Sequence, residues 1–470
     1  MSNACADDLI DFVHGLSLER VPADVVAQAR ACLLDALGCG IFGSAQDWSR
    51  LLADEMTAEG TRGRSTVICR PERLAAPAAA LCNGTAIHGF ELDDLIAESI
   101  VHPAAAVIPA ALATAEAVAA SGSRLLAGIV SGYEVMHRLG VALGVEPARR
   151  GFHTTSLTGP VAAAVAAGVV QSLSREEMRS AIGLACSAAA GIKSFAAGHG
   201  GGMVKRLHLG RAAEAGVRMG QLAARGFRGP PSAIDGRFGL LEVFGGAGAQ
   251  PGRLSRGLGE EWALRDVWFK VYPICGWIQS AVQLLQQFRG PHPLQEAEIR
   301  AVRVGVSSYA ARNNGEPAPR DTMGAQYSIP FCAAIALLGD PHDPAAFRPA
   351  AVDDPVTRAV AQRVSVEIDP AVEAVYPAQF GASVLLTLAD GRTRQGVVMD
   401  CHGTPADPCT AAERMDKFML LAGKRLSATA AGQIARAVEA LAGSPSVNQL
   451  TAALGTEVER GGRPQLRVWS

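Results

Sequence analysis

The hydrophobic periodicity of this chain changes twice along its length, and these changes constrain the fold more than any other feature. Through about residue 265, stretches rich in Ala, Leu and Val follow helical spacing between short glycine-containing loops, and strand-like alternation is nearly absent. From Trp268 onward, period-two spacing marks three segments, IRAVRVGVSS, RVSVEIDP and GASVLLTLADGRTRQGVVMD, the last with an ADGR turn between two strands. After GTPADP the helical pattern returns. The sequence therefore predicts a mainly α protein with one smaller α+β segment.

The composition indicates a soluble enzyme without nucleic-acid or membrane partners. A formal net charge of −2 and a pI near 6.6 argue against nucleic-acid binding, which depends on basic contacts to phosphates. Residues 103–120 and 157–170 are apolar but do not exceed the roughly 18–20 residues of a membrane span, so we expect buried helices there. The N-terminal MSNACADDLIDFV has early acids and does not resemble a signal peptide. We expect a cytoplasmic protein.

The ten cysteines contain no CxxC pair and no regular framework, which is typical of reduced core residues. Cys275, beside a Tyr-Pro pair, is the one cysteine whose position suggests a test for reactivity. A small buried apolar residue remains the favoured interpretation of it.

Residues 81–103, LCNGTAIHGFELDDLIAESIVHP, concentrate titratable groups in an otherwise apolar region. His88 and Glu91 share a face if this run is helical, and Asp93 and Asp94 follow at its end. His102 precedes a proline, the residue favoured at the first position of a helix, so we expect His102 to cap a new helix. Free N–H groups at a helix start can bind a substrate carboxylate.

Two further segments have related features. In GFHTTSLTGP (151–160), His153 lies at the start of an apolar helix among hydroxyl groups suited to capping. The glycine-rich run at 198–202 contains His199 and leads to Lys205 and His208. Glycine allows such a loop to bring N–H groups close to an anion, and its lysine could add charge or act as a base. His208 more readily supports the helix that it begins.

These segments occur in a fixed order with ARACLLDALGCGIFGS, SGYEVMHRLG, KRLHLGRAAEAG, GFRGPPSAIDGRFGLLEVF, FKVYPICGW, AQYSIPFCAAIALLGD and GTPADP. In that order the chain resembles the MmgE/PrpD family, which includes 2-methylcitrate dehydratases, cis-aconitate decarboxylases and an iminodisuccinate epimerase. The resemblance implies a helical body built from residues 1–268 and 404–470, and an α+β lid of residues 269–403. It also implies a homodimer and catalysis without a metal or other cofactor.

The resemblance places catalytic roles on His102, His153 and Lys205, with His88, Glu91, Asp93 and Asp94 as supporting or substrate-binding residues. The chain departs from the family pattern at four positions, where it has Glu91 for Asp, Leu95 for Thr, Gln279 for His and Phe331 for Tyr. We expect Gln279 and Phe331 to alter the substrate pocket. His199 is a candidate to compensate for the histidine absent at 279.

A metal site at His88 and the three acids is the alternative interpretation of that cluster, because imidazole and carboxylates suit divalent ions. The other interpretation is that the acids orient the histidines and the lysine.

Imidazoles suit acid–base chemistry near neutral pH, and cations stabilise the charge that forms when a proton leaves carbon next to a carboxylate. The predicted function is a metal-independent lyase of the dehydratase type acting on a small di- or tricarboxylate. An isomerase or epimerase, a decarboxylase and a non-catalytic ligand-binding homologue remain alternatives.

Overall fold

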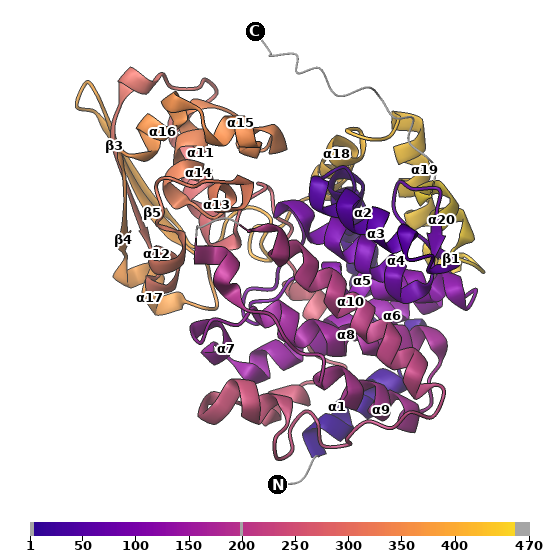
Figure 1. The fold of residues 1–470 in the computed structure, drawn as a ribbon. Coiled ribbons are helices and arrows are strands. Elements are labelled where there is room, and N and C mark those ends of the chain that lie inside the picture. Colours follow the sequence, from indigo (N-terminus) through magenta and orange to yellow (C-terminus); the bar gives the residue numbers. More distant parts are fainter. Residues whose placement is uncertain (1–3, 198–200, 456–470) are drawn as a thin grey trace.

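The computed structural model describes residues 4–197 and 201–455. Helices make up most of the chain, and a four-stranded sheet lies at the left of Figure 1. The protein is therefore mainly α with a smaller α+β part, as the periodicity predicts.

Closely packed helices form the first part of the chain. They are α1 (Ala4–His14), α2 (Ala23–Gly43), α3 (Asp47–Ala58), α4 (Ala76–Ile87), α5 (Ala104–Ala117), α6 (Gly122–Leu143), α7 (Glu146–Arg149), α8 (Thr154–Gln171), α9 (Arg175–Cys186) and α10 (Met203–Ala223). Helix α8 packs against α5, α6, α9 and α10 at the centre of this body. Small residues allow the close approach: a Cβ on Gly84 of α4 would lie 2.7 Å from the carbonyl oxygen of Ala105 in α5.

Two regions of this part differ from the helical prediction. Strands β1 (Arg62–Thr66) and β2 (Arg73–Leu74) form a small antiparallel pair that is too short to show alternation in the sequence. Residues 227–268 form turns and short 3-10 or π segments in place of α-helices. Their many glycines and prolines explain this, since both residues disfavour helix interiors.

The four-stranded sheet has the order β4-β3-β5-β6. Its strands are β3 (Ile299–Val306), β4 (Val364–Ile368), β5 (Ala382–Leu388) and β6 (Thr393–Val398), and the helices between or before them are α11 (Gln279–Arg289), α12 (Ser308–Asn314), α13 (Thr322–Gln326), α14 (Ile329–Leu338), α15 (Pro349–Val352), α16 (Pro355–Ala361) and α17 (Pro370–Val375). Strand β3 runs parallel to β4 and antiparallel to β5, and Val304 faces Val366 and Val384 in the two registers. The three strand segments and the ADGR turn predicted from the sequence are confirmed.

After the sheet the chain returns to the helical body. Helices α18 (Ala411–Ala422), α19 (Ala428–Glu439) and α20 (Asn448–Leu454) end the described chain, and α18 and α19 pack against α2. Figure 1 shows this contact as yellow C-terminal helices beside indigo N-terminal ones. The packing supports a body built from both ends of the chain, although the boundaries 1–268, 269–403 and 404–470 stay a prediction.

Among the described helices, α2 alone is long and apolar enough to cross a membrane by length and composition. Within this fold, 67% of its most apolar window is buried. The two apolar stretches that the sequence assigns to buried helices are α5 and α8, and both are almost wholly buried.

Candidate active site

The loop between α4 and α5 carries most of the titratable groups, and its backbone is unusual. Helix α4 ends at Ile87, a 3-10 turn spans His88–Phe90, and Glu91 has a left-handed φ of 58°. His88 and Glu91 therefore do not share a helical face, which corrects the helical interpretation of this run. Ile100 also has a positive φ, 54°, although it is β-branched. Such conformations are costly for non-glycine residues and cluster at functional sites.

His102 lies two residues before α5, and the N-cap position itself belongs to Pro103. The backbone N–H of His102 donates to Thr155 Oγ1 at 3.3 Å, which ties the starts of α5 and α8 together. Its Nδ1 lies 2.7 Å from the carbonyl oxygen of Asp94. A carbonyl oxygen only accepts, so Nδ1 carries the proton and Nε2 holds the free lone pair. Burial, with the charge of Lys270, holds the pKa of His102 well below its usual value.

His153 is the N-cap residue of α8, as the sequence predicts. Its Nδ1 lies 3.2 Å from Nδ1 of His208 on α10, so one of these two nitrogens must carry a proton and the other must accept it. Burial and the charge of Lys205 lower the pKa of His153 well below its usual value. The ring of His88 lies 5.2 Å from that of His102 and 5.9 Å from that of His153.

Asp93 and Asp94 orient groups rather than face open space. Oδ2 of Asp93 accepts a 2.6 Å hydrogen bond from Nδ1 of His88, and both side chains are fully buried. Asp94 accepts from the Tyr133 hydroxyl at 2.6 Å and from the N–H of Ala104 at 3.0 Å. Burial raises the pKa of Asp94 to about 7. The Asp93 contact supports the interpretation that an acid orients a histidine, whereas the Asp94 carboxylate holds Tyr133 and the start of α5.

Glu91 is the centre of a buried ionic cluster. Its carboxylate pairs with Lys205, with Arg206 at 3.4 Å and with Lys270 at 3.4 Å. Burial alone would raise the pKa of Glu91, but the three cations together hold it well below its usual value. Burial lowers the pKa of Lys205, whereas Glu91 and Asp93 outweigh burial and raise the pKa of Lys270. One carboxylate thus faces three buried cations.

A cavity of about 40 Å³ adjoins these groups at the junction of the helical body and the α+β part. Its lining includes Glu91, Leu95, Ile100, His102, Phe152, His153, Thr154, Lys193, Phe195, Cys275, Trp277, Tyr309, Tyr327 and Phe380. Lys205 does not line the cavity but binds Glu91, which does. The structure thus brings His102 and His153 to one cavity, with Lys205 directly behind its acidic residue.

Profiles of protein families match most of the chain. The MmgE/PrpD N-terminal domain matches residues 7–251, and the MmgE/PrpD C-terminal domain matches residues 272–442. The chain belongs to the MmgE/PrpD family. One relative, the cis-aconitate decarboxylase-like protein oryM of Aspergillus oryzae, is 28% identical over 96% of this chain and 97% of its own length.

Two other members of the MmgE/PrpD family carry the names of specific activities. The cis-aconitate decarboxylase of Aspergillus terreus is 30% identical over 70% of this chain and 71% of its own length. The 2-methylcitrate dehydratase of Cupriavidus necator is 25% identical over 84% of both chains.

Two departures from the MmgE/PrpD pattern do not line the cavity, so their effect on the substrate pocket stays a prediction. The amide nitrogen of Gln279 donates to the carbonyl oxygens of Tyr272 and Ile274 at 2.9 and 3.2 Å, so this side chain holds a turn together. Phe331 is fully buried in the core on α14, with its ring 6.3 Å from that of Phe347. Leu95, by contrast, lines the cavity. A position next to a motif in the sequence does not specify whether the side chain at that position faces the site.

Several groups at this site have no separate signal in the sequence. Lys270 lies in FKVYPICGW and Arg206 follows Lys205 in KRLHLG, so both were within family motifs but carried no separate signal. Lys193 and Tyr309 lie outside the segments that resemble the family. Their convergence depends on tertiary packing. His199 lies outside the described residues.

Cys275 lines the cavity, but burial raises the pKa of its thiol, which disfavours the reactive thiolate. Among residues 4–197 and 201–455, no group of three or more His, Cys, Asp or Glu side chains is arranged to hold a metal ion. The described acids near His88 are instead engaged by lysines, an arginine, a tyrosine and histidines.

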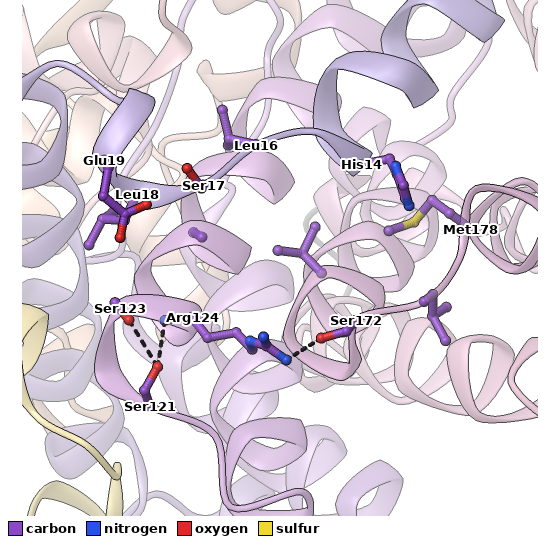
Figure 2. A pocket seen from close by; sticks show the side chains of 13 residues that line it. His14, Leu16, Ser17, Leu18, Glu19, Ser121, Ser123, Arg124, Ser172 and Met178 are labelled. Carbon is purple, nitrogen blue, oxygen red and sulfur yellow. Dashed lines mark hydrogen bonds between the residues drawn. The ribbon is translucent and has the colours of Figure 1, made fainter.

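A larger cavity, of about 400 Å³, lies elsewhere in the helical body (Figure 2). Its polar lining includes His14, Glu19 and Arg124, and Arg124 donates a hydrogen bond to the hydroxyl of Ser172. None of the residues predicted to form the active site lines it. The smaller cavity is therefore the candidate active site on the basis of its chemistry.

Proposed function

We propose that this protein is a lyase that acts on a small di- or tricarboxylate by moving a proton at a carbon next to a carboxylate. The observation that carries this proposal is His102. It lines the cavity as a neutral imidazole whose Nδ1 is committed to the Asp94 carbonyl, which leaves Nε2 as a base. A base with a defined free nitrogen is the first requirement for such a reaction.

The charge balance around the cavity supports a carboxylate substrate. Lys205, Arg206 and Lys270 share Glu91, and Lys270 also lies 3.8 Å from Asp93. Abstraction of a proton next to a carboxylate places additional negative charge on that group as an enolate. Fixed cations in a buried site stabilise this charge without having to reorganise.

For dehydration, we propose that Nε2 of His102 removes the proton while the bond between the neighbouring carbon and its hydroxyl breaks. The hydroxyl leaves as water if it receives a proton, and His153 can supply it. This role requires His208 Nδ1 to donate to His153 Nδ1, because a neutral His153 then carries its proton on Nε2. With that tautomer of the pair, His153 is placed to act as the acid.

Decarboxylation is the second candidate, favoured by relatives that bear the name cis-aconitate decarboxylase. In that reaction the carbon–carbon bond to one carboxylate breaks, carbon dioxide leaves, and the carbon that keeps the electron pair takes a proton. His153 Nε2–H could supply this proton as well. Loss of the family histidine and tyrosine at Gln279 and Phe331 would favour epimerisation or non-catalytic binding, but neither residue lines the cavity. These two alternatives gain no support from the structure.

An NMR screen in D2O with 2-methylcitrate, citrate and cis-aconitate tests the proposal. Dehydration produces an alkene from a hydroxy acid, and decarboxylation releases carbon dioxide and incorporates deuterium. Exchange of deuterium without either product indicates epimerase-type chemistry. If no substrate in a wider set of polycarboxylates reacts or exchanges, the proposed function is wrong.

We also propose that catalysis needs no metal. Turnover should survive dialysis against EDTA, because lysines and an arginine already supply the positive charge that a metal would provide. Loss of turnover that one divalent ion restores would contradict this.

The homodimer and the cytoplasmic location are likewise proposals that rest on the resemblance to the family and on the sequence. Light scattering should then give twice the 48.7 kDa of one chain.

A further inference from the structure

Lys193 is fixed to the segment that carries His153. Its backbone N–H donates to the carbonyl oxygen of Gly151 at 2.8 Å, and the N–H of His153 donates to the carbonyl oxygen of Gly191 at 3.0 Å. An antiparallel bridge between Phe152 and Ile192 lies between these two bonds. The position of the Lys193 backbone relative to His153 is therefore set by a short, paired segment.

The side chain of Lys193 crosses to the α+β part. Its Nζ donates a hydrogen bond to the hydroxyl of Tyr309 on α12 and lies 4.7 Å from the centre of the Tyr309 ring. That ring packs 4.9 Å from Trp277 and 5.7 Å from Tyr376. The rings of Tyr309, Trp277 and Tyr376 form an aromatic wall, and Lys193 lies against it. Because Nζ donates to the Tyr309 hydroxyl oxygen, the O–H of Tyr309 remains free to donate a hydrogen bond.

Lys193 differs from the other lysines at the site in its charge partners. Lys205 and Lys270 both pair with Glu91, whereas Lys193 forms no ion pair with any carboxylate of the described residues. Burial lowers the pKa of Lys193 to about 8, so much of its amine stays protonated near neutral pH. A desolvated cation without a counterion is a favourable partner for an anionic ligand.

Two other polar groups of the same cavity lack hydrogen-bond partners among the described residues. The indole N–H of Trp277 and the hydroxyl of Thr154 are buried and make no hydrogen bond within the described structure. Buried donors normally have partners, and those that lack one often mark a binding function.

We propose that Lys193, from the aromatic wall, binds a second carboxylate of the substrate and so selects di- and tricarboxylates over monocarboxylates. The inference rests on the proposed function, because it assumes that one carboxylate of the substrate is already held beside the carbon that reacts. Lys193 acts as a specificity-determining residue: its contact with the second carboxylate is made equally in the ground and transition states. It therefore contributes to KM rather than to kcat.

Steady-state kinetics of Lys193→Met, Lys193→Arg and Lys193→Gln on a polycarboxylate that the wild type converts test this proposal. Lys424→Met is the matched control, because Lys424 is exposed. We expect Lys193→Met and Lys193→Gln to raise KM by about 10- to 100-fold with kcat within about threefold, as for loss of a charged hydrogen bond. Lys193→Arg should keep KM within about threefold, and Lys424→Met should match the wild type.

Thermal stabilisation by tricarballylate, a saturated tricarboxylate, provides a readout that does not need turnover. We expect it to stabilise the wild type and Lys193→Arg, and to stabilise Lys193→Met much less. Three outcomes would overturn the proposed role of Lys193 and leave the proposed function standing. They are equal stabilisation of wild type and Lys193→Met, an unchanged KM, and a fall in kcat at constant KM. If the wild type neither converts any polycarboxylate nor is stabilised by one, the proposed function itself fails.

Discussion

A single proton position distinguishes the histidines of this site. The Asp94 carbonyl can only accept, so it determines the tautomer of His102, whereas the contact between His153 and His208 requires only that one of the two donate. The tautomer of His102 is thus defined by a backbone atom, whereas that of His153 depends on which nitrogen of the histidine pair carries the proton. Neither relationship is visible in the sequence, because it depends on atoms that packing brings together.

His102→Gln should lower kcat by on the order of 10² to 10⁴, since Gln preserves a hydrogen-bonding side chain but cannot act as a base. The matched control is His292→Gln, because His292 is exposed. Circular dichroism should show that both variants fold. Near-normal turnover by His102→Gln on the identified substrate would remove His102 from the mechanism.

Acid should destabilise the protein from about pH 6.5 downward. Burial lowers the pKa of His88, His102 and His153 in the folded state, whereas the unfolded histidines titrate near pH 6.5. Below that pH the unfolded chain binds protons that the folded chain does not, so the stability present above pH 6.5 is lost as the pH falls. The melting temperature should fall between pH 7.5 and 5, less steeply in His102→Gln. Equal slopes would show that His102 is not held neutral.

At the scale of elements, the loop between α4 and α5 carries most of the titratable side chains of the candidate site. It leaves α4 through a left-handed Glu91, turns back through a left-handed Ile100 and ends at His102 before α5. Two left-handed non-glycine residues, each costing on the order of 1 kcal/mol or more, persist because ion pairs and hydrogen bonds surround them. The clustered motif predicted where this loop lies, but its backbone shape comes from contacts with α8, α10 and residues around Lys270.

The difference between local sequence signals and contacts made in the fold explains which site residues could be predicted. His102 and His153 precede helices, and that position has a local signature in proline, threonine and serine. Lys270 and Lys193 become important only because burial and distant partners change their charge environment. Gln279 and Phe331 carried a family signal but point into a turn and into the core. Local patterns predicted the helix starts, and only tertiary structure orients the remaining side chains.

Phe331→Tyr tests whether this departure matters for catalysis. Phe331 is fully buried among apolar groups, so the added hydroxyl should cost about 1–3 kcal/mol in the free energy of unfolding. Turnover should stay within about twofold, because Phe331 does not line the cavity. Urea unfolding and steady-state kinetics measure both quantities. Phe227→Tyr, at a side chain that is 58% exposed, is the control. A large gain in turnover would place residue 331 in the site after all.

At the scale of the whole molecule, the two ends of the chain share one core. Phe418 of α18 is 1% exposed, and a Cβ on Gly38 of α2 would lie 3.2 Å from its ring. The candidate active-site cavity lies between the helical body and the α+β part and is only about 40 Å³. Ligand pockets usually measure about 300–1,000 Å³, so we expect these two parts to separate when a substrate enters. A body closed by both chain ends provides a stable base for that movement.

Phe418→Ala should lower the free energy of unfolding by about 3–5 kcal/mol, because a large side chain leaves a cavity between α2 and α18. Phe238→Ala, at a side chain that is 73% exposed, should change it little. Hydrogen exchange should then increase in α2 as well as in α18 if both belong to one cooperative unit. Faster exchange confined to α18 would contradict a body built from both ends.

The contact between α2 and α18 also sets an order of events during synthesis. The ribosome must add the 367 residues between Gly43 and Ala411 before α18 begins, which takes roughly 20–70 s at about 5–20 residues per second. Throughout that interval, the side of α2 that packs against α18 stays uncovered. This helix is long and apolar enough to resemble a membrane anchor. A nascent chain stalled before residue 411 therefore leaves the α18-facing side of α2 uncovered, and the synthesis of α18 is the step that covers it.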